Sequence, residues 1–335
     1  MEKSVLDRFR GLLKEHKNTI VEWFNSVPEE KKAQLCCDPG CSIDTIVQKH
    51  DEALHRIETG EFGECKYCKD GVEIERLEID FTTQVCLGHF SEAELKVLER
   101  DLELAAKVQK QLLPSSLPAL KGIQLAAHTE PAKIVSGDYF DFFSYTNGAQ
   151  GIAVADVMGK GLPASMLMSN LQASLRILGP DYHDLDKLAV RLNELFRYNL
   201  KLISFITLFL LKIDTEKKAI QYCNAGHNPA IYWDAKKKEL KRLRPTGPAI
   251  GLIPNAVYGA DNLQYSEGDV LLIFTDGVSE ARNSNEEEFG EKRLENYLIE
   301  NLDKPAEVIV SDLRRQAKQF AGMLQDDVTL ISVKF

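Results

Sequence analysis

Five aspartates stand at the ends of apolar stretches of the chain: Asp138, Asp156, Asp276, Asp326 and Asp327. A carboxylate at the end of a buried strand costs free energy unless a partner compensates its charge. Hard divalent cations prefer carboxylate oxygens and water as ligands, and two such cations ~3.5–4 Å apart activate a water for attack on phosphate. The pattern therefore predicts a divalent-metal site with hydrolytic chemistry on phosphate groups.

The segment Thr146–Gly148 predicts a β-hairpin that determines how two of these aspartates face each other. A two-residue loop would place Asp138 and Asp156 on opposite faces of the hairpin. A three-residue loop, with Gly148 in a left-handed bulge position, would place them directly across from each other on one face. Two carboxylates so placed repel each other, so this second register requires a cation between them.

Five separated motifs occur in this order along the chain: SGDYFDF, ADVMGKGLPASMLM, NAGHNPA, FTDGVSE and DDVTL. In their order and spacing, from near Ala105 to Phe335, the chain resembles the metal-dependent protein phosphatases (the PPM family), and most of all their bacterial RsbU/SpoIIE branch of serine phosphatases. The resemblance implies an α+β fold, a β-sandwich flanked by helices. It also implies two Mn²⁺ or Mg²⁺ ions and hydrolysis of phosphoserine or phosphothreonine by a water that bridges the metals.

The same resemblance implies roles for particular residues. It implies metal ligands at four carboxylates: Asp138, Asp156, Asp276 and Asp326. Asp156 would bridge both metals, with help from the backbone carbonyl of Val157. Asp327 stands where related phosphatases often have asparagine, so the choice between the two adjacent aspartates as the metal ligand stays open.

Lys133 precedes Asp138 by five residues, where related phosphatases often have a basic residue. Its ammonium group would hold the substrate phosphate as a point charge. The alternative is a solvated surface lysine. In the turn that follows Cys223, His227 is expected to be structural, and Cys223 is expected in the core rather than as a nucleophile.

A second cluster has different chemistry: Cys65-x₂-Cys68 and, after seventeen residues, Cys86-x₂-His89. Three thiolates and one imidazole at this spacing are typical of a structural zinc site. The alternative, a reduced loop with scattered thiols, would leave a small polar segment with little core. From about Ala53 to His89 the chain also resembles the DksA/TraR zinc-finger family, which usually has a fourth cysteine in place of this histidine. That family's acidic tip motif is not evident, so binding to RNA polymerase is not carried over.

A chain of 335 residues is longer than one hydrophobic core usually supports, so we expect more than one domain. We predict a helical hairpin with a zinc finger at residues 1–90, a linker helix at 91–114 and a phosphatase domain at 115–335. The hairpin tip carries three further cysteines, Cys36, Cys37 and Cys41. One interpretation is a redox or metal cluster. The other is that they are simply small residues at a turn, because they fit no common ligand spacing.

The linker helix begins at the capping box Ser91–Glu94 and ends before Pro114. Its core positions repeat at intervals of three and four: Leu95, Leu98, Leu102, Ala105, Gln109 and Leu112. This spacing predicts a short coiled-coil seam between two copies of the chain, with Gln109 as a polar layer, and hence a homodimer. The alternative is a helix packed on its own phosphatase domain.

Composition and charge exclude several classes of protein. The formal net charge of −10 argues against a nucleic-acid partner, the longest apolar run is too short for a bilayer, and the N-terminus lacks a signal-peptide core. We therefore expect a cytoplasmic protein without a membrane or nucleic-acid partner. The resemblance implies a phosphorylated STAS-domain anti-anti-sigma protein as the substrate, within a partner-switching pathway. Two alternatives remain: a non-catalytic zinc-finger adaptor of transcription with a phosphatase-like sensor domain, and a hydrolase of small phosphomonoesters.

Overall fold

The computed structural model describes residues 3–26, 43–89, 92–199 and 205–335. The chain divides into two units, Met1–Glu99 and Arg100–Phe335, and each is described here by itself. The boundary falls within helix α5 (Glu92–Leu112). The cysteines of the predicted hairpin tip and the predicted capping residue Ser91 lie outside the described residues.

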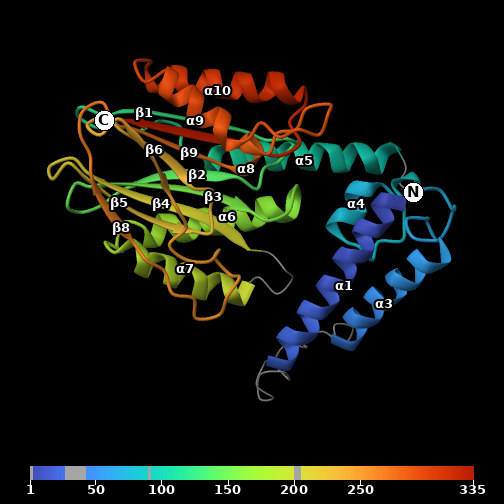
Figure 1. The fold of residues 1–335 in the computed structure, drawn as a ribbon. Helices are drawn as coiled ribbons and strands as arrows, with labels where there is room; N and C mark the ends of the chain where they lie inside the picture. Colours follow the sequence, from blue (N-terminus) through green and yellow to red (C-terminus); the bar gives the residue numbers. More distant parts are fainter. Residues whose placement is uncertain (1–2, 27–42, 90–91, 200–204) are drawn as a thin grey trace. The chain divides into compact units, whose positions relative to one another are not determined.

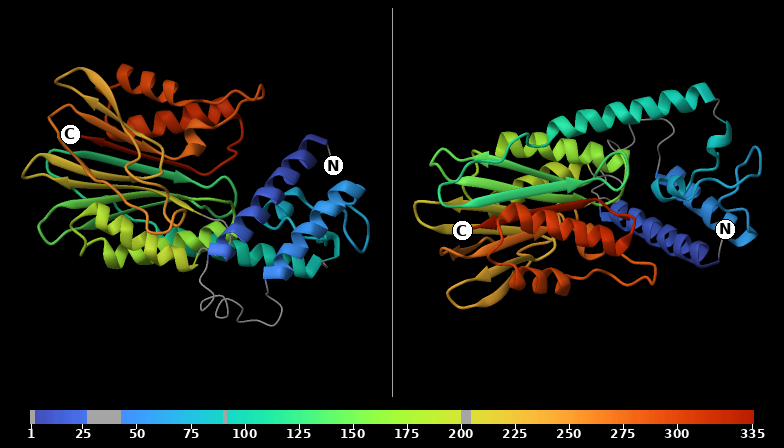
Figure 2. Two further views of the ribbon diagram at one scale, coloured as in Figure 1. Left: turned by 60° about the horizontal axis from the view of Figure 1, so that its bottom comes forward. Right: turned by 90° about the horizontal axis from the view of Figure 1, so that it is seen from above.

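The second unit is a sandwich of two five-stranded antiparallel sheets with helices on its outer faces (Figures 1 and 2). The first sheet has the order β1-β10-β9-β6-β7, with strands Gln124–Glu130, Val328–Lys334, Val270–Phe274, Ala230–Asp234 and Glu239–Leu243. The second has the order β2-β3-β4-β5-β8, with strands Tyr139–Ser144, Gln150–Val157, Ile206–Asp214, Ala219–Ala225 and Asp261–Gln264. The predicted α+β sandwich flanked by helices is confirmed.

Each sheet has a helical layer packed on its outer face. Helices α6 (Leu162–Leu178) and α7 (Leu185–Asn199) pack on the second sheet, and α9 (Glu291–Glu300) and α10 (Ala306–Ala321) pack on the first. Along β3, Ile152 and Val154 point between the sheets, whereas Ala153 and Ala155 point toward the helices. Because both faces are buried, the central strands are continuous apolar runs rather than alternating ones.

The hairpin of β2 and β3 has the register that the three-residue loop requires. Tyr139 pairs with Ala155, and Gly148 has a φ of 81°, in the left-handed region that glycine adopts without strain. Continued by one residue, this register places Asp138 opposite Asp156. The structure therefore selects the arrangement in which the two carboxylates share a face.

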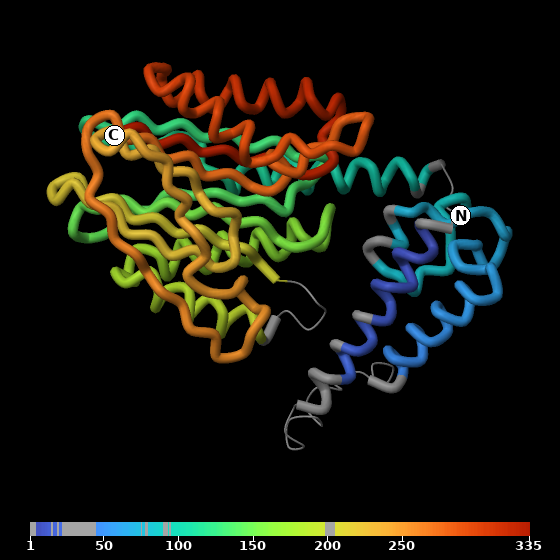
Figure 3. Tube along the Cα trace, viewed as in Figure 1, coloured from blue at the N-terminus to red at the C-terminus, as the bar shows by residue number. Residues whose placement is uncertain are grey.

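Strands β1 and β10 come from the beginning and the end of the second unit's sequence, and they pair with each other, as Figure 3 shows by colour. Strand β10 also pairs with β9 in the antiparallel sense, with Leu330 opposite Phe274. The start of β10 therefore lies beside the end of β9. This pairing brings the segment Asp326–Asp327 next to Asp276, which is the first residue of the short helix α8 (Asp276–Ser279).

The first unit contains the two helices predicted for a hairpin, α1 (Lys3–Ser26) and α3 (Ile43–Thr59), which contact each other. A short helix, α4 (Ile74–Ile79), and a 3₁₀ turn, Leu87–His89, follow. These elements share one small apolar core, which includes Phe9, Leu13, Ala53, Ile57, Cys65, Leu77 and Cys86. Two of the predicted zinc ligands are therefore part of the core itself.

Gln109 on helix α5 has a different environment from the one predicted. Its side chain is 8% exposed, its Nε2 donates to the carbonyl of Ser136 at 2.6 Å, and the Ser136 N–H donates to its Oε1 at 2.9 Å. The assignment of Gln109 to a polar layer between two chains is therefore wrong, because the amide is satisfied within its own chain. Other apolar side chains of α5, among them Leu98 and Leu104, are exposed, and the homodimer stays a prediction.

Candidate active site

Carboxylates from both sheets of the second unit lie close enough to influence one another's ionisation. Burial and then the charges of Asp276 and Asp326 raise the pKa of Asp156 to about 8. Burial and then Asp326 raise the pKa of Asp276 to about 6. Burial and then Asp156 raise the pKa of Asp138 well above its usual value. The chain thus concentrates negative charge at one place, where a bound cation would relieve the repulsion.

Asp138 is held by hydroxyl groups that the sequence reasoning missed. Its side chain is buried, and its Oδ2 accepts hydrogen bonds from Thr275 Oγ1 at 2.8 Å and from Thr329 Oγ1 at 2.6 Å. Asp138 precedes a strand of the second sheet, whereas Thr329 lies in β10 of the first sheet and Thr275 directly follows β9 of the first sheet. The signal was present, because each threonine is within two residues of a predicted ligand, but only the folded sheets reveal the contact.

The two adjacent aspartates before β10 have different partners. Both carboxylate oxygens of Asp327 accept backbone N–H groups, from Ala132 at 2.7 Å and from Gly137 at 2.7 Å. The carboxylate of Asp326 instead forms an ion pair of 2.8 Å with Lys160. Asp327 therefore anchors the loop that leads into β2, whereas Asp326 contacts the flexible side chain of Lys160 and accepts the N–H of Asp327 at 2.9 Å.

Two glycines allow the backbone segments around these carboxylates to approach closely. A Cβ atom at Gly277 would lie 1.9 Å from the carbonyl oxygen of Asp327, so only glycine fits there. A Cβ atom at Gly137 would lie 3.0 Å from the carbonyl oxygen of Val157. The Val157 carbonyl, which was predicted to assist metal binding, therefore lies beside the residue that precedes Asp138.

Lys160 is a cation at this site that the sequence reasoning also missed. Its Nζ donates to the carbonyl of Gln325 at 2.8 Å as well as pairing with Asp326. Its charge partly offsets the rise in the pKa of Asp156 and Asp276. The available signal was its position between two glycines, directly after the strand that carries Asp156.

The structure leaves the role of Lys133 open and places His227 in the core. Lys133 is exposed, and it follows Ala132, whose N–H is bonded to Asp327, so it belongs to the anchored loop. His227 is 1% exposed, its Nδ1 lies 2.7 Å from the Thr207 hydroxyl, and burial lowers its pKa to about 4. A histidine so enclosed acts as a core residue, as predicted.

The four residues predicted to bind zinc lie together in the first unit. In the part of the chain that the structure describes, Cys65, Cys68, Cys86 and His89 form the one group of three or more His, Cys, Asp or Glu residues whose donor atoms all lie within 4.8 Å of one another. Cys65 Sγ is 3.2 Å from His89 Nε2, and Cys68 Sγ is 3.4 Å from Cys86 Sγ. Ligand atoms of tetrahedral zinc are about 3.3–3.8 Å apart, so this donor set fits the metal.

The thiols of this cluster do not ionise independently. Burial opposes ionisation of Cys65, but the backbone N–H groups of Cys68 and Cys86 outweigh it and lower its pKa to about 5. Although the backbone N–H of Asp70 favours its thiolate, burial and the sulfurs of Cys86 and Cys65 raise the pKa of Cys68 to about 12. A second thiolate beside the first is therefore unfavourable unless a cation lies between them.

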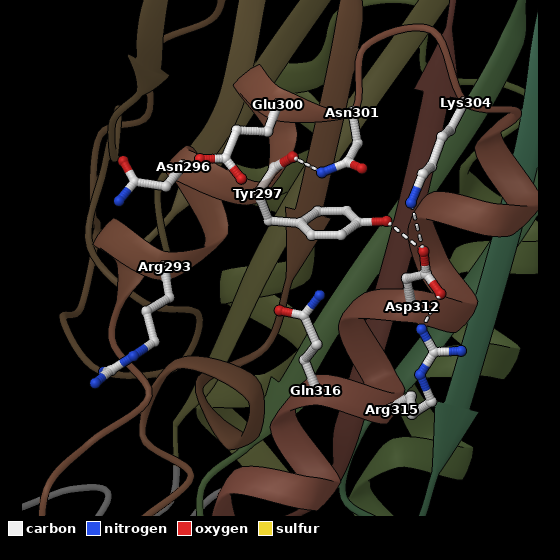
Figure 4. Close-up of a pocket in the computed structure, with 9 residues that line it drawn as sticks. All are labelled: Arg293, Asn296, Tyr297, Glu300, Asn301, Lys304, Asp312, Arg315 and Gln316. Carbon is white, nitrogen blue, oxygen red and sulfur yellow. Dashed lines mark hydrogen bonds and ion pairs between the residues drawn. The ribbon is translucent and has the colours of Figure 1, made fainter.

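A hollow of about 360 Å³ on the outer side of helices α9 and α10 belongs to neither cluster (Figure 4). In it, the Tyr297 hydroxyl, Lys304 and Arg315 all converge on the carboxylate of Asp312. None of the predicted site residues lines it. The converging groups already satisfy one another's hydrogen bonds and charges. The hollow is therefore lined by a structural polar network and is not the active site.

Comparison with known proteins now identifies the second unit. The profile of one family, described as Stage II sporulation protein E (SpoIIE), matches residues 146–335, more than half of the chain. The chain belongs to the SpoIIE family. The SpoIIE match covers the ligand candidates Asp156, Asp276, Asp326 and Asp327, whereas Lys133 and Asp138 precede it and the Cys/His cluster lies far outside it.

Curated relatives of this SpoIIE-family chain include two bacterial proteins. The phosphoserine phosphatase RsbU of Bacillus subtilis is 28% identical over 266 residues, which are 76% of this chain and 78% of RsbU. Protein IcfG of Synechocystis is 31% identical over 261 residues, which are 70% of this chain but 41% of IcfG. The chain therefore spans less than half the length of IcfG.

The fold has close counterparts among solved structures. The SiaA-PP2C domain of Pseudomonas aeruginosa superimposes with a TM-score of 0.64 at 19% identity and covers 73% of this chain and 100% of that domain. The second unit therefore has the fold of PP2C domains, in agreement with the sandwich predicted from sequence.

Proposed function

We propose that the chain is a metal-dependent protein phosphatase that hydrolyses phosphoserine or phosphothreonine. The observation that carries the proposal is the convergence of Asp138, Asp156, Asp276 and Asp326, whose mutual repulsion and burial raise three of their pKa values. Membership of the SpoIIE family and the similarity to a phosphoserine phosphatase support it.

Two Mn²⁺ or Mg²⁺ ions are the cofactors that suit these oxygen ligands. Asp156 would bridge them with help from the Val157 carbonyl, and Asp138, Asp276 and Asp326 would complete the set. We assign Asp327 a structural role, because backbone N–H groups already occupy both of its oxygens. Bound cations would supply a nucleophilic water and neutralise charge on the phosphate.

The protein's own side chains position this machinery. Thr275 and Thr329 orient the carboxylate of Asp138, and Asp327 fixes the loop that carries Lys133. Lys133 and Lys160 are the cations available to attract a phosphomonoester, which carries up to two negative charges. Their flexible side chains suit a phosphate group that must bind as part of the substrate and be released as product.

The substrate that we favour is a phosphorylated STAS-domain anti-anti-sigma protein in a partner-switching pathway. The similarity to RsbU over most of its length supports this substrate class. The alternative substrate, a small phosphomonoester, would use the same carboxylates, so only an experiment distinguishes the two substrate classes. A non-catalytic adaptor is disfavoured, because every predicted carboxylate is present and several of them lie close enough to raise one another's pKa values.

The test is release of phosphate from a phosphorylated STAS-domain protein and from p-nitrophenyl phosphate, with Mn²⁺ and with chelator. We expect Mn²⁺-dependent turnover of both, with a much higher kcat/KM for the protein. Turnover of the aryl phosphate alone would support the small-molecule hydrolase, and turnover of neither would support the adaptor.

For the first unit we propose one structural Zn²⁺ held by Cys65, Cys68, Cys86 and His89. The support is the separation of their donor atoms and the coupled ionisation of the thiols. A regulatory role of this unit, the homodimer and a cytoplasmic location are further parts of the proposal. Among the described helices, none combines the length and the apolar composition that crossing a bilayer demands.

A further inference from the structure

Exposed apolar side chains occur on segments that lie next to the predicted metal ligands. We define the apolar rim as five exposed residues: Ile134, Met158, Leu162, Met166 and Met323. Three of the five methionines of the chain belong to it. Contiguous exposed apolar surface is typical of interaction sites, and methionine is frequent where a surface must adapt to a partner.

The position of helix α6 ties the rim to the site. Leu162 and Met166 are one helical turn apart, with exposed fractions of 44% and 66%. Between them, the buried Ala164 would lie 3.3 Å from a Cβ atom at Gly137. The first turn of α6 therefore packs through Ala164 against the residue that precedes Asp138. Leu162 and Met166 lie on the opposite, exposed face of this turn, where a bound protein could contact them but a small molecule in the site would not.

The other rim residues lie on neighbouring segments of the same site. Met158 comes two residues after Asp156 in the chain, and Ile134 belongs to the loop anchored by Asp327. Met323 precedes Gln325, whose carbonyl accepts a hydrogen bond from Lys160 in the connection between β3 and α6. The rim is thus built from three segments that tertiary contacts hold around one catalytic centre.

We infer that this apolar rim is the specificity surface of the phosphatase site and docks a protein substrate that carries apolar side chains beside its phosphoserine. A small phosphomonoester would reach the carboxylates and lysines without touching Leu162 or Met166. A bilayer is a poor occupant, because the acidic cluster that the rim encloses and the net charge of −10 oppose an anionic membrane surface. The inference rests on the proposed phosphatase function.

The decisive experiment compares selectivity in the full-length chain. Selectivity is the ratio of kcat/KM for a phosphorylated STAS-domain protein to kcat/KM for p-nitrophenyl phosphate, both with Mn²⁺. We expect Leu162→Ser combined with Met166→Ser to lower this ratio about tenfold, which corresponds to ~1.4 kcal/mol of binding selectivity. Met166→Gln alone, which retains helix propensity, should lower the ratio by a smaller factor.

The matched control is Ile177→Ser, an equally exposed apolar residue (71%) near the other end of the same helix. It should leave the ratio unchanged. An unchanged ratio in the Leu162/Met166 variants overturns the inference while the phosphatase proposal stands. A rise in turnover of both substrates also overturns it, because the rim would then be covered by another part of this chain. If the wild-type protein does not dephosphorylate the STAS-domain protein, the proposed function itself fails, and the rim's role fails with it.

Discussion

The two donor clusters of this chain differ in nearly every physical respect. The cluster of the first unit joins three sulfurs and one imidazole within 4.8 Å and includes residues of a small apolar core. The cluster of the second unit consists of carboxylates at the ends of strands, and in the described residues no three of them meet the same spacing. The first arrangement would enclose one soft cation on all sides, whereas the second would suit two hard cations together with water and a substrate.

The comparison teaches that a metal can serve folding or chemistry according to what surrounds it. The first unit has so few buried side chains that two of its proposed ligands are part of the core, so we expect its fold to depend on the proposed metal. The second unit has three extensive apolar layers, between and outside its sheets. Its overall fold therefore does not rest on a metal, although Asp327 anchors one loop.

The largest expected effect is on activity. Asp156→Ala and Asp276→Ala should each remove nearly all Mn²⁺-dependent turnover and leave the thermal unfolding of the second unit intact, because each removes a ligand but no core contact. Asp303→Ala, at an exposed loop position, is the control. More than about a tenth of wild-type turnover at saturating Mn²⁺, a barrier change below ~1.4 kcal/mol, would show that the ligand assignment is wrong.

The next-largest expected effect is on folding, and we expect it in the first unit but not in the second. Cys65→Ser should abolish zinc binding and unfold the first unit, seen as rapid hydrogen exchange across residues 43–89, while residues 205–335 stay protected. Elemental analysis of the wild-type protein should give one zinc per chain. Cys223→Ser changes a buried thiol of the second unit and should keep the zinc. Protection of residues 43–89 in the Cys65 variant would mean that the first unit folds without metal.

The smallest expected effect is on the free energy of unfolding of the second unit. It concerns ion pairs that stabilise this unit without metal. Glu130 at the end of β1 pairs with Arg314 and Lys318 of α10, and these bonds lower its pKa from 4.5 to about 2. A lowered folded-state pKa means that the stabilisation is complete above pH 4.5 and is lost as the pH falls toward 2. Glu130→Gln should cost about 1 kcal/mol at neutral pH, because solvent screens half-exposed partners.

The same variant and the wild-type protein should have equal stability below pH 2 in chelator. Denaturant titrations of the second-unit transition at both pH values measure the difference. Glu267→Gln, at an exposed position, is the control and should match the wild type throughout. An equal cost of Glu130→Gln at both pH values would mean that the side chain acts through packing and not through charge.

The sequence was sufficient to predict the structure where the prediction depended on residues close together in the chain. The register with Gly148 in the left-handed region was one of the two predicted and is the one observed, and the linker helix predicted at 91–114 matches α5 (Glu92–Leu112). The contacts of Thr275, Thr329 and Lys160 could not be predicted, because they join segments far apart in the chain and no spacing rule encodes them. Gln109 was misinterpreted because a polar residue at a core position is satisfied equally well by a second chain or by a nearby loop.

The paired hydrogen bonds between Gln109 and Ser136 have a consequence for engineering the chain. They fix the rotation of helix α5 about its own axis, since a helix advances about 100° per residue and only one residue in each turn faces a given point. A single residue inserted between Leu98 and Gln109 would turn every preceding side chain of the helix by that angle. An insertion of seven residues would nearly restore the original phase. Chimeras that attach a different N-terminal domain to the second unit should therefore be joined in steps of seven residues, counted from Gln109.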